Sequence, residues 1–347
     1  MNYLQIIDLK DEKKWDSIVK SFRGYDVCYL HAYANSFFLH GDGRPFLLYY
    51  EDGSTRAINV VMVRDISASK QFEGILEEGK WFDLSSPYGY GGFLVEGDNY
   101  EAVNRAYDEY CREKGYVCEF VRFHLLSIHK EHYNGVTETH THNIIRSLEL
   151  APKDMLMDFE HKVRKNIKKA INSGLDILID TTGEHLQDFL NIYYNTMSRT
   201  GANGNFYFNS QFFEALQLMK DHYVYFHVLY ENRIISTELA LYGNENCYSF
   251  LGGTDSQFFS LRPNDFLKYE IIKWAQENGL KRFILGGGYG EDDGIYQYKK
   301  SFAPNGVFNF YVGKKIFYQD KYDQLMKLRG FITEEHRNIR YFPQYRG

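Results

Sequence analysis

The segment from Leu261 to Phe302 combines residue types that could act on an activated donor. Pro263 and Asp265 are typical of a helix start, and apolar residues at i, i+4, i+7 and i+8 predict a helix that a later Asn-Gly pair ends. A strand is expected at Lys281–Leu285, and Gly286-Gly287-Gly288 after it lets the backbone approach a ligand closely. A helix whose first turn faces a cleft presents free N–H groups and the positive end of its dipole. The sequence therefore predicts a site for an anionic or carbonyl-bearing donor.

Carboxylates in and near this segment are the candidates for a general base. Glu238 lies on an expected strand that faces the donor helix, Asp265 lies in the first turn of that helix, and Asp292-Asp293 lies in the glycine loop. Each could take a proton from an ammonium acceptor. The sequence does not choose among them.

A strongly basic segment precedes this region in a chain whose formal net charge is −6. Within eight residues it carries five cations, which are Lys162, Arg164, Lys165, Lys168 and Lys169. Such a run on a helix is usually a solvated face. In an acidic protein it is also the place that could hold the phosphates of tRNA or an anionic polysaccharide. Because the net charge is negative, the protein as a whole has no positive field that would hold DNA.

Composition describes an ordinary globular protein of two domains, with 347 residues of which 44% are hydrophobic and 25% charged. The four cysteines are scattered, and no apolar run approaches the roughly 20 residues of a spanning helix. We therefore expect a cytoplasmic protein that does not insert into a membrane. His140 and His142 would point to one side of a strand, but without an HExxH helix or nearby cysteines we expect no metal.

The chain contains two halves with the same order of elements. In each half a hairpin is followed by a helix that ends in glycine and then by a strand, and the helix ends match as Tyr110-Cys-Arg-Glu-Lys-Gly115 and Trp274-Ala-Gln-Glu-Asn-Gly279. Similarity at half the chain length indicates a duplicated domain. The second half reads as strand, two helices, three antiparallel strands, long helix and strand, which is the order of an acyl-CoA N-acyltransferase (GNAT) domain. The expected fold class is α/β, a tandem of GNAT-like domains with mixed, mainly antiparallel sheets.

Several blocks resemble the Fem-type (FemABX) aminoacyl-transferases, which build peptidoglycan cross-bridges from two tandem GNAT domains. The blocks are Lys162-Val-Arg-Lys-Asn-Ile-Lys-Lys-Ala170, Arg262-Pro-Asn-Asp-Phe-Leu267, Asn278-Gly-Leu280, Gly286-Gly-Gly288 and Tyr298-Lys-Lys-Ser-Phe302. In the first half the resemblance extends only to the duplication and to Pro87-Tyr-Gly-Tyr-Gly-Gly-Phe93. It implies an enzyme that transfers an acyl or aminoacyl group to an amine.

The resemblance also implies roles for individual residues. Lys299 would stabilise the tetrahedral oxyanion; the alternative is a lysine on a solvated strand edge. Arg199 would reach an acceptor phosphate or carboxylate; the alternative is a cation at a helix C-terminus. The Tyr88, Tyr90 and Gly91 loop could stack an acceptor sugar or peptide, or fill its own core. The expected donor-binding residues are Arg262, Asn264, Phe266, Leu267, Gly286, Gly287, Gly288 and Tyr298.

Three departures from the family each remove a feature that would bind one of the family's substrates. The chain lacks the coiled-coil insertion that docks tRNA, it has no lysine between Lys20 and Lys70 for a nucleotide-sugar pyrophosphate, and Arg262-Pro-Asn-Asp-Phe266 lacks the glycines of the usual acetyl-CoA loop. The co-substrate is expected to be aminoacyl-tRNA or acyl-CoA, with no tightly bound cofactor. The acceptor would be a small molecule or a cell-wall precursor, held in a cleft between domains.

The expected domains are residues 1–155, with 314–347 packed back on them, and residues 156–313 carrying the donor site. Two alternatives to the Fem-like transferase are open. One is an acyl-CoA N-acetyltransferase acting on an amino sugar or a peptide. The other is a non-catalytic glycan-binding module.

Overall fold

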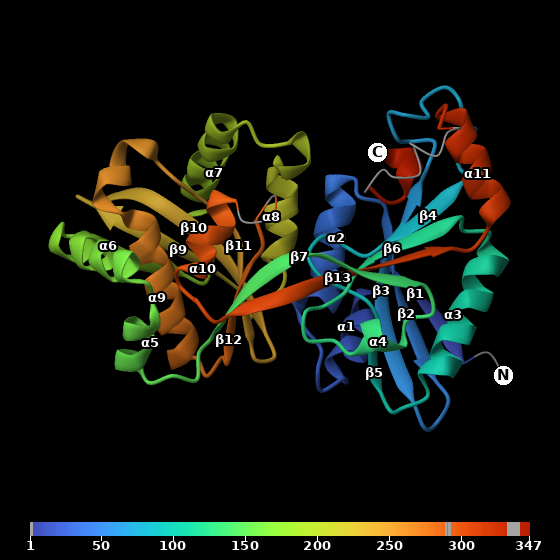
Figure 1. Cartoon of the computed structure of the whole chain (residues 1–347), viewed down its shortest axis with the longest axis horizontal. Coiled ribbons are helices and arrows are strands. Elements are labelled where there is room, and N and C mark those ends of the chain that lie inside the picture. Colours follow the sequence, from blue (N-terminus) through green and yellow to red (C-terminus); the bar gives the residue numbers. More distant parts are fainter. Residues whose placement is uncertain (1–2, 289, 291–292, 332–340) are drawn as a thin grey trace. The chain divides into compact units, whose positions relative to one another are not determined.

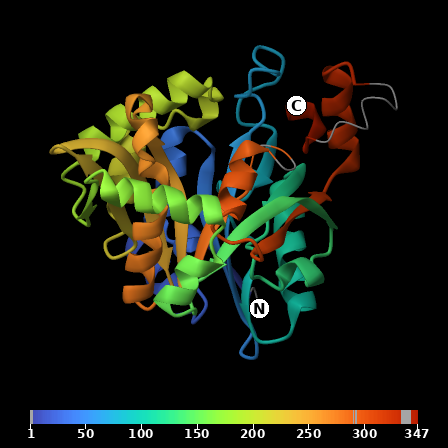
Figure 2. The same ribbon diagram turned by 60° about the vertical axis from the view of Figure 1, so that its left-hand side comes forward.

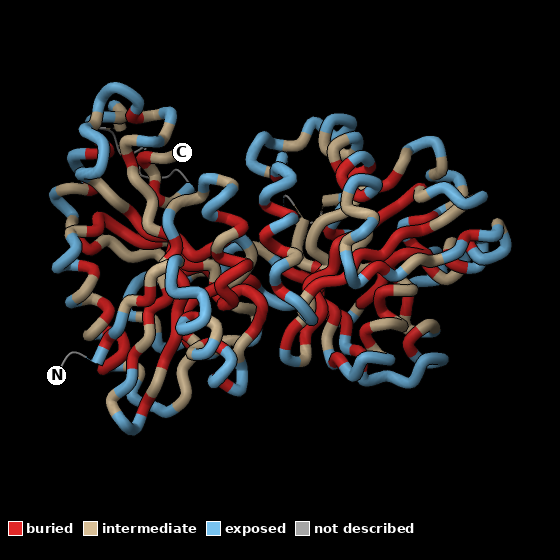
Figure 3. Tube along the Cα trace, turned by 180° about the vertical axis from the view of Figure 1, so that it is seen from behind, coloured by how far each residue is buried: buried red, intermediate tan, exposed pale blue. Residues whose placement is uncertain are grey.

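The computed structural model describes residues 3–288, 290, 293–331 and 341–347, and it divides the chain into two compact units. Unit 1 comprises residues 1–140 and 310–347, and unit 2 comprises residues 141–309. Within each unit the strands are largely buried and the outer faces of the helices are exposed (Figure 3). The domain boundaries at 155/156 and 313/314 remain predictions about where independent domains begin and end.

Unit 2 contains a six-stranded sheet in the order β8-β9-β10-β11-β12-β7 (Figure 1). All neighbours pair antiparallel except β11 and β12, which are parallel. The strands are β7 (Val136–Ser147), β8 (Asp176–Asp180), β9 (Tyr223–Tyr230), β10 (Arg233–Gly243), β11 (Asn246–Thr254) and β12 (Arg282–Gly286). The element order predicted for the second half is confirmed.

Helices cover both faces of this sheet (Figure 2). Tyr225 and Phe226 are successive residues of β9 and therefore point to opposite faces. The ring of Phe189 on α7 lies 5.1 Å from Tyr225, and that of Trp274 on α9 lies 5.5 Å from Phe226. The helices are α5 (Pro152–Asp158), α6 (His161–Asn172), α7 (Leu186–Thr200), α8 (Ser210–Leu216), α9 (Pro263–Glu277) and α10 (Gly294–Lys300). The apolar sides of α6 and α9 share one core with β9.

Unit 1 repeats this plan with the order β1-β2-β3-β4-β6-β13. Again the fourth and fifth strands, β4 and β6, are parallel. The strands are β1 (Leu4–Asp8), β2 (Arg44–Glu51), β3 (Arg56–Asp65), β4 (Phe82–Ser85), β5 (Leu94–Glu96, paired with β3), β6 (Cys118–Arg122) and β13 (Val307–Ile316). The helices are α1 (Glu12–Lys20), α2 (His31–His40), α3 (Tyr100–Lys114), α4 (His129–His132) and α11 (Gln319–Leu328).

The sixth strand of each sheet is exchanged between the two copies of the fold. β7 follows β6 in the chain, yet its residues 144–147 pair with β12 of unit 2. β13 follows β12, yet its residues 312–316 pair with β6 of unit 1. Each copy is therefore completed by the strand that follows the other copy in sequence.

The C-terminal segment is anchored in unit 1 by a buried carboxylate on β4. Tyr322, Leu325 and Met326 of α11 belong to an apolar cluster of this unit. Asp83 is fully buried and accepts hydrogen bonds from the Tyr345 hydroxyl at 2.7 Å and from Arg346 Nε at 2.6 Å. It also accepts one from Arg64 Nε at 2.7 Å, so the tail supplies two of the three groups that satisfy Asp83 here.

We expect Arg346→Met to lower the free energy of unfolding by about 1.5–3 kcal/mol, the range for hydrogen bonds to a charged group. The control is Arg44→Met, because Arg44 pairs with Asp8 while more than half of its side chain is exposed, and such surface pairs contribute about 0–1 kcal/mol. Urea unfolding of both variants measures the difference. Equal effects would show that the tail contributes no buried ion pair.

Candidate functional site

The sheet of unit 2 opens between its two parallel strands. β11 and β12 pair only over Asn246–Tyr248 and Arg282–Ile284. Beyond Tyr248, β11 continues to Thr254 beside β10 alone, and residues 249–253 are half-buried. In open α/β sheets ligands bind at the carboxyl ends of strands where neighbours diverge. The opening is therefore the place to look for the site.

A buried ion pair lies at this opening. Glu238 of β10 is 5% exposed and Lys268 of α9 is 8% exposed, and Lys268 Nζ contacts Glu238 Oε2 directly. The same ammonium donates to Ser249 Oγ at 2.6 Å. Because Glu238 pairs with Phe226 across the sheet, it lies on the face that α9 covers. Burying two charges is costly, so such a pair indicates a functional role more than a stabilising one.

Two polar atoms of this cluster are buried and have no hydrogen-bond partner in the described structure. One is the second carboxylate oxygen of the pair, Glu238 Oε1, and the other is the hydroxyl oxygen of Tyr298. Burial raises the pKa of Tyr298 above its usual range, and the carboxylates of Asp265 and Glu238 raise it further. Native proteins rarely leave buried polar atoms unpaired except at functional sites.

Lys299 joins this cluster from α10. Its Nζ donates to the carbonyl oxygen of Gly287 at 2.6 Å. Burial and, next, the positive charge of Lys268 together lower the pKa of Lys299 to about 8. The alternative of a lysine on a solvated strand edge is wrong, because residues 294–300 form a helix.

The glycine turn after β12 shapes the space around this lysine. Gly286 has φ +77°, a conformation that side chains disfavour, and a Cβ there would lie 3.4 Å from Lys299 Nζ. A Cβ on Gly287 would come within 2.7 Å of Asn143 Oδ1, and one on Gly288 would collide with Asp293. Asp293 caps α10 by accepting from the Tyr296 amide at 2.7 Å. Asp292, the other candidate base of this loop, lies outside the described residues.

The first turn of α9 contributes a second buried carboxylate. Asp265 accepts from Asn166 Nδ2 at 3.2 Å, and burial raises its pKa. Arg262, at the N-cap, has φ +65°, which is unusual for a residue with a side chain. Asn264 accepts from Thr254 Oγ1 at 2.6 Å and so ties the turn to β11. Phe266 and Leu267 belong to the apolar core, which leaves little of either side chain for a donor.

The described residues of unit 1 do not repeat the charged cluster at the equivalent positions. Aligning the glycines that end α3 and α9 places Asn104 at the position of Lys268. Asn104 donates to the carbonyl oxygen of His132 at 2.7 Å. Strand β3, the counterpart of β10, has no ionisable residue between Ala57 and Val63. Of the two copies of the fold, unit 2 is therefore the one that carries the candidate site.

The predicted acceptor residues are distributed over both units. Arg199 ends α7, with its guanidinium 5.0 Å from the Phe259 ring, and lines a groove of about 840 Å³ in unit 2. In unit 1, Tyr88 is 40% exposed and its carbonyl oxygen accepts from Tyr33 at 2.6 Å. The Tyr90 ring lies 5.6 Å from the His124 ring, and the Gly91 amide donates a hydrogen bond to the Arg122 carbonyl oxygen at 2.7 Å. Their role in acceptor binding stays a prediction.

The basic helix is α6, and its cations are not equivalent. The guanidinium of Arg164 already donates hydrogen bonds to the carbonyl oxygens of Met157 and Phe159. The other four are exposed and form no salt bridge with a described residue; they are Lys162, Lys165, Lys168 and Lys169. These four lysines form a surface that we call the α6 lysine face.

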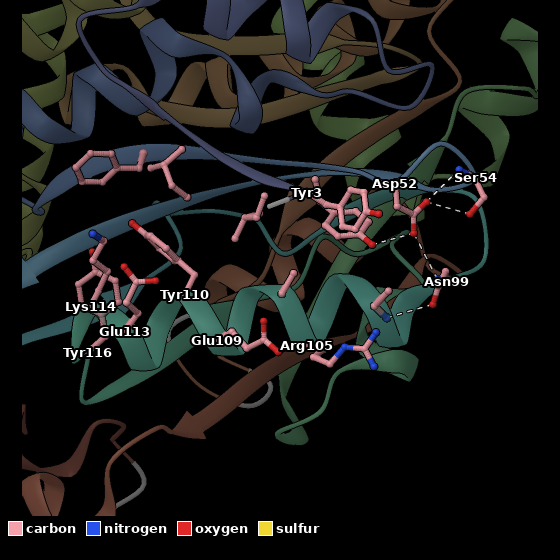
Figure 4. Close-up of a pocket in the computed structure, with 16 residues that line it drawn as sticks. Tyr3, Asp52, Ser54, Asn99, Arg105, Glu109, Tyr110, Glu113, Lys114 and Tyr116 are labelled. Atoms are coloured by element: carbon pink, nitrogen blue, oxygen red, sulfur yellow. Dashed lines mark hydrogen bonds between the residues drawn. The ribbon is translucent and has the colours of Figure 1, made fainter. Parts of the chain in front are cut away.

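A groove of about 1150 Å³ lies in unit 1 between α3 and strands β1 and β2 (Figure 4). Tyr3, Arg105, Glu109 and Tyr110 are among the residues that line it. None of the predicted site residues lines this groove, and the sequence analysis did not anticipate it. Lys268 was not predicted from the sequence either, although a lysine between Phe266-Leu267 and Ile271-Ile272, on the apolar side of the helix, signals a buried charge.

Comparisons with known proteins agree with this architecture. Residues 158–300 match the sequence family described as "Acetyltransferase (GNAT) domain". FemX is similar in structure, with 15% identity over 93% of this chain and 99% of that chain and a TM-score of 0.69. L-PGS from Bacillus licheniformis has a TM-score of 0.57 and 13% identity, over 94% of this chain and 98% of that chain. The C-terminal domain of a putative lysylphosphatidylglycerol synthetase from Agrobacterium fabrum has a TM-score of 0.56 and 12% identity, over 93% of this chain and 98% of that chain.

No curated protein sequence matches the chain. The structural similarities establish the fold, and the predicted tandem of GNAT-like domains is confirmed. The matched segment contains Glu238, Lys268 and Lys299, so the charged cluster lies within the GNAT domain of unit 2. No described helix has the length and apolar character needed to cross a membrane.

Proposed function

We propose that the protein transfers an activated aminoacyl or acyl group to an amine, with the donor bound in unit 2. The observation that carries this proposal is the buried Glu238–Lys268 pair with Lys299 beside it, at the opening between β11 and β12. At the position of Lys268 unit 1 has Asn104, and its strand β3 has no ionisable residue between Ala57 and Val63. The match of residues 158–300 to a GNAT acetyltransferase domain supports the reaction class.

In the proposed reaction the neutral amine attacks the donor carbonyl carbon. A C–N bond forms, the carbonyl π electrons move to oxygen, and the ammonium of Lys299 stabilises that oxyanion. Collapse of the intermediate expels the donor's leaving group with its bonding electrons. The proton lost by the nitrogen passes to a carboxylate, and Asp265, whose pKa burial raises, suits that role among Glu238, Asp265 and Asp293.

Two donor classes fit this chemistry. Acyl-CoA is favoured by the GNAT domain match and would make the protein an N-acetyltransferase acting on an amino sugar or a peptide. Aminoacyl-tRNA is favoured by the structural similarity to FemX and by the α6 lysine face. We propose a cytoplasmic protein whose acceptor is a small molecule or a cell-wall precursor.

Thermal unfolding in the presence of candidate ligands tests the proposal. A ligand that binds only the folded state raises stability by RT ln(1 + [L]/Kd), about 2.7 kcal/mol at a hundredfold excess over Kd. Acyl-CoA thioesters, aminoacyl-tRNA and amino sugars form the panel, followed by a transfer assay with any donor and acceptor that bind. Absence of stabilisation by every donor would contradict the proposal.

If tRNA is the donor, changing Lys165, Lys168 and Lys169 to glutamate should abolish its binding, because these lysines are exposed and free of salt bridges to described residues. Wild-type affinity should fall with salt at a log–log slope of about 0.7–0.9 per phosphate contact. Filter binding between 50 and 200 mM salt measures both. Lys153, Lys220 and Lys281 changed together to glutamate form the charge-matched control, and an equal loss there would place the contact elsewhere.

A further inference from the structure

We infer that the groove of unit 1 is a docking site for an amphipathic helix of another protein, with basic residues beside the apolar stripe of that helix. One wall of the groove is α3, and the other is formed by β1 and the hairpin of β2 and β3 (Figure 4). The inference concerns a partner protein and does not depend on the reaction proposed for unit 2.

The first observation is that unit 2 fills the equivalent place with a helix. There β8 and β9 correspond to β1 and β2, α9 corresponds to α3, and α6 packs against α9. Asn166 of α6 donates to Asp265 of α9 at 3.2 Å. Val163, Ile167 and Ala170 of α6, at i, i+4 and i+7, are buried in the core that α9 shares with β9. An amphipathic helix is therefore what this face of the fold accepts.

The second observation is that the corresponding face of unit 1 carries apolar side chains that remain accessible. Ile6, Phe46, Ala106 and Tyr110 line the groove and are only half-buried, although they pack on the core cluster beneath them. Tyr3 beside them is 45% exposed. An apolar surface with a polar rim is typical of an interaction site. The 15 residues of α3 span about 22 Å, so about four turns of a second helix fit along it.

The third observation is the charge along this groove. Its ionisable residues, apart from tyrosines, are three carboxylates and two cations, which are Asp52, Glu109, Glu113, Arg105 and Lys114. Glu109 and Glu113 are exposed and form no salt bridge with a described residue, whereas Arg105 already lies 4.0 Å from Glu101. Residues four apart lie on one side of a helix, so a partner with lysine or arginine at the same spacing can pair with both free carboxylates. The groove therefore suits a basic helix.

The lining also favours a helix over a glycan. A sugar stacks on the open face of an aromatic ring, but Tyr50 is 2% exposed and Tyr116 is 7% exposed. The hydroxyl of Tyr50 already donates to Asp52 at 2.8 Å. Ala102 and Ala106 are one turn apart on the α3 wall, and their small side chains let a second helix approach to the usual 8–10 Å between axes.

A synthetic peptide with the sequence of residues 160–173 is the probe, because α6 has the required apolar stripe and lysines and fills the equivalent place in unit 2. In the comparison peptide serine replaces Val163 and Ile167, which keeps the charge and removes the stripe. Both peptides carry alanine in place of Asn166 and Asn172, which raises their helix propensity. We expect saturable binding of the first peptide to the full-length protein in fluorescence anisotropy, and binding of the second about tenfold weaker or less.

Variants of the protein locate the contact. Ala106→Arg places a long cation in the groove, and Glu109→Lys/Glu113→Lys reverses the charge of its rim; each should weaken binding of the first peptide about tenfold or more. The control is Glu73→Lys/Glu78→Lys, the same charge change at exposed residues of unit 1 outside the groove, which should bind as the wild type does. Urea unfolding of each variant shows whether its fold is intact, and the exposed double variant carries the test if Ala106→Arg is unstable.

Three results would overturn the inference. They are absence of peptide binding to the wild type, equal affinity for the two peptides, and an equal loss of binding in the groove variants and the control. Stabilisation of the wild type by a soluble chito-oligosaccharide that Ala106→Arg abolishes, without peptide binding, would make the groove a glycan site instead. None of these results bears on the transfer reaction, so the proposed function stands or falls separately.

Discussion

Lys299→Ala is expected to reduce the rate of transfer about a hundredfold to a thousandfold, the usual effect of losing one oxyanion partner. Donor affinity should change little, because the lysine acts on charge that develops only in the transition state. Single-turnover transfer and equilibrium donor binding measure the two effects separately. An unchanged turnover would show that Lys299 lies outside the reacting centre.

The pH dependence of the wild-type enzyme should report the same lysine. Burial lowers the pKa of Lys299 to about 8, so its ammonium form, which stabilises the oxyanion, disappears as the pH rises through 8. We expect the transfer rate at saturating substrate to fall above that pH. In Lys299→Ala this falling limb should be absent from the residual activity. Lys300→Ala, one residue along α10, is the control and should keep it.

Lys268→Met is expected to destabilise the protein by about 3–5 kcal/mol, because it leaves the buried carboxylate of Glu238 without its cation. Methionine matches the length of the lysine side chain and fills the same space. The effect should be visible in urea unfolding at neutral pH. Lys273→Met on the same helix is the control, since the Lys273–Glu270 pair is part-exposed and should contribute about 1 kcal/mol or less.

The double variant Lys268→Met/Glu238→Leu separates the cost of an unpaired charge from the loss of packing. Replacing both partners of a buried pair by apolar residues is often neutral or stabilising. We therefore expect the double variant to recover much of the stability that Lys268→Met loses. If the double variant is as unstable as Lys268→Met alone, the pair is needed for packing in this site.

Elements with strong local signals were predictable from the sequence. The hairpin of β9 and β10 and the helix α9 were predicted and are present, because each is set by residues close together in the chain. Helix α3 ends at Gly115, as the matching helix ends predicted, and it begins at Tyr100, where the Asn99 side chain accepts a hydrogen bond from the Ala102 amide.

The charged cluster was only partly predictable. Glu238, Asp265 and Lys299 were named from motif and resemblance, but their partners come from elements far apart in sequence. Lys268 contacts Glu238, which is 30 residues away, and Asn166 donates to Asp265 from a helix 99 residues away. No local pattern encodes such distances. The orphaned Glu238 Oε1 is visible only when all its neighbours are in place.

The exchange of β7 and β13 has a consequence for synthesis on the ribosome. The sheet of unit 1 needs residues 312–316, which emerge only after the whole of unit 2 has been made. Unit 2 has its sixth strand from the start, since residues 144–147 precede the rest of it. Unit 2, which carries the charged cluster, can therefore complete its sheet first although it is translated second. A nascent chain that stops near residue 305 would leave β6 with an open edge, the kind of surface that other chains can pair with during synthesis.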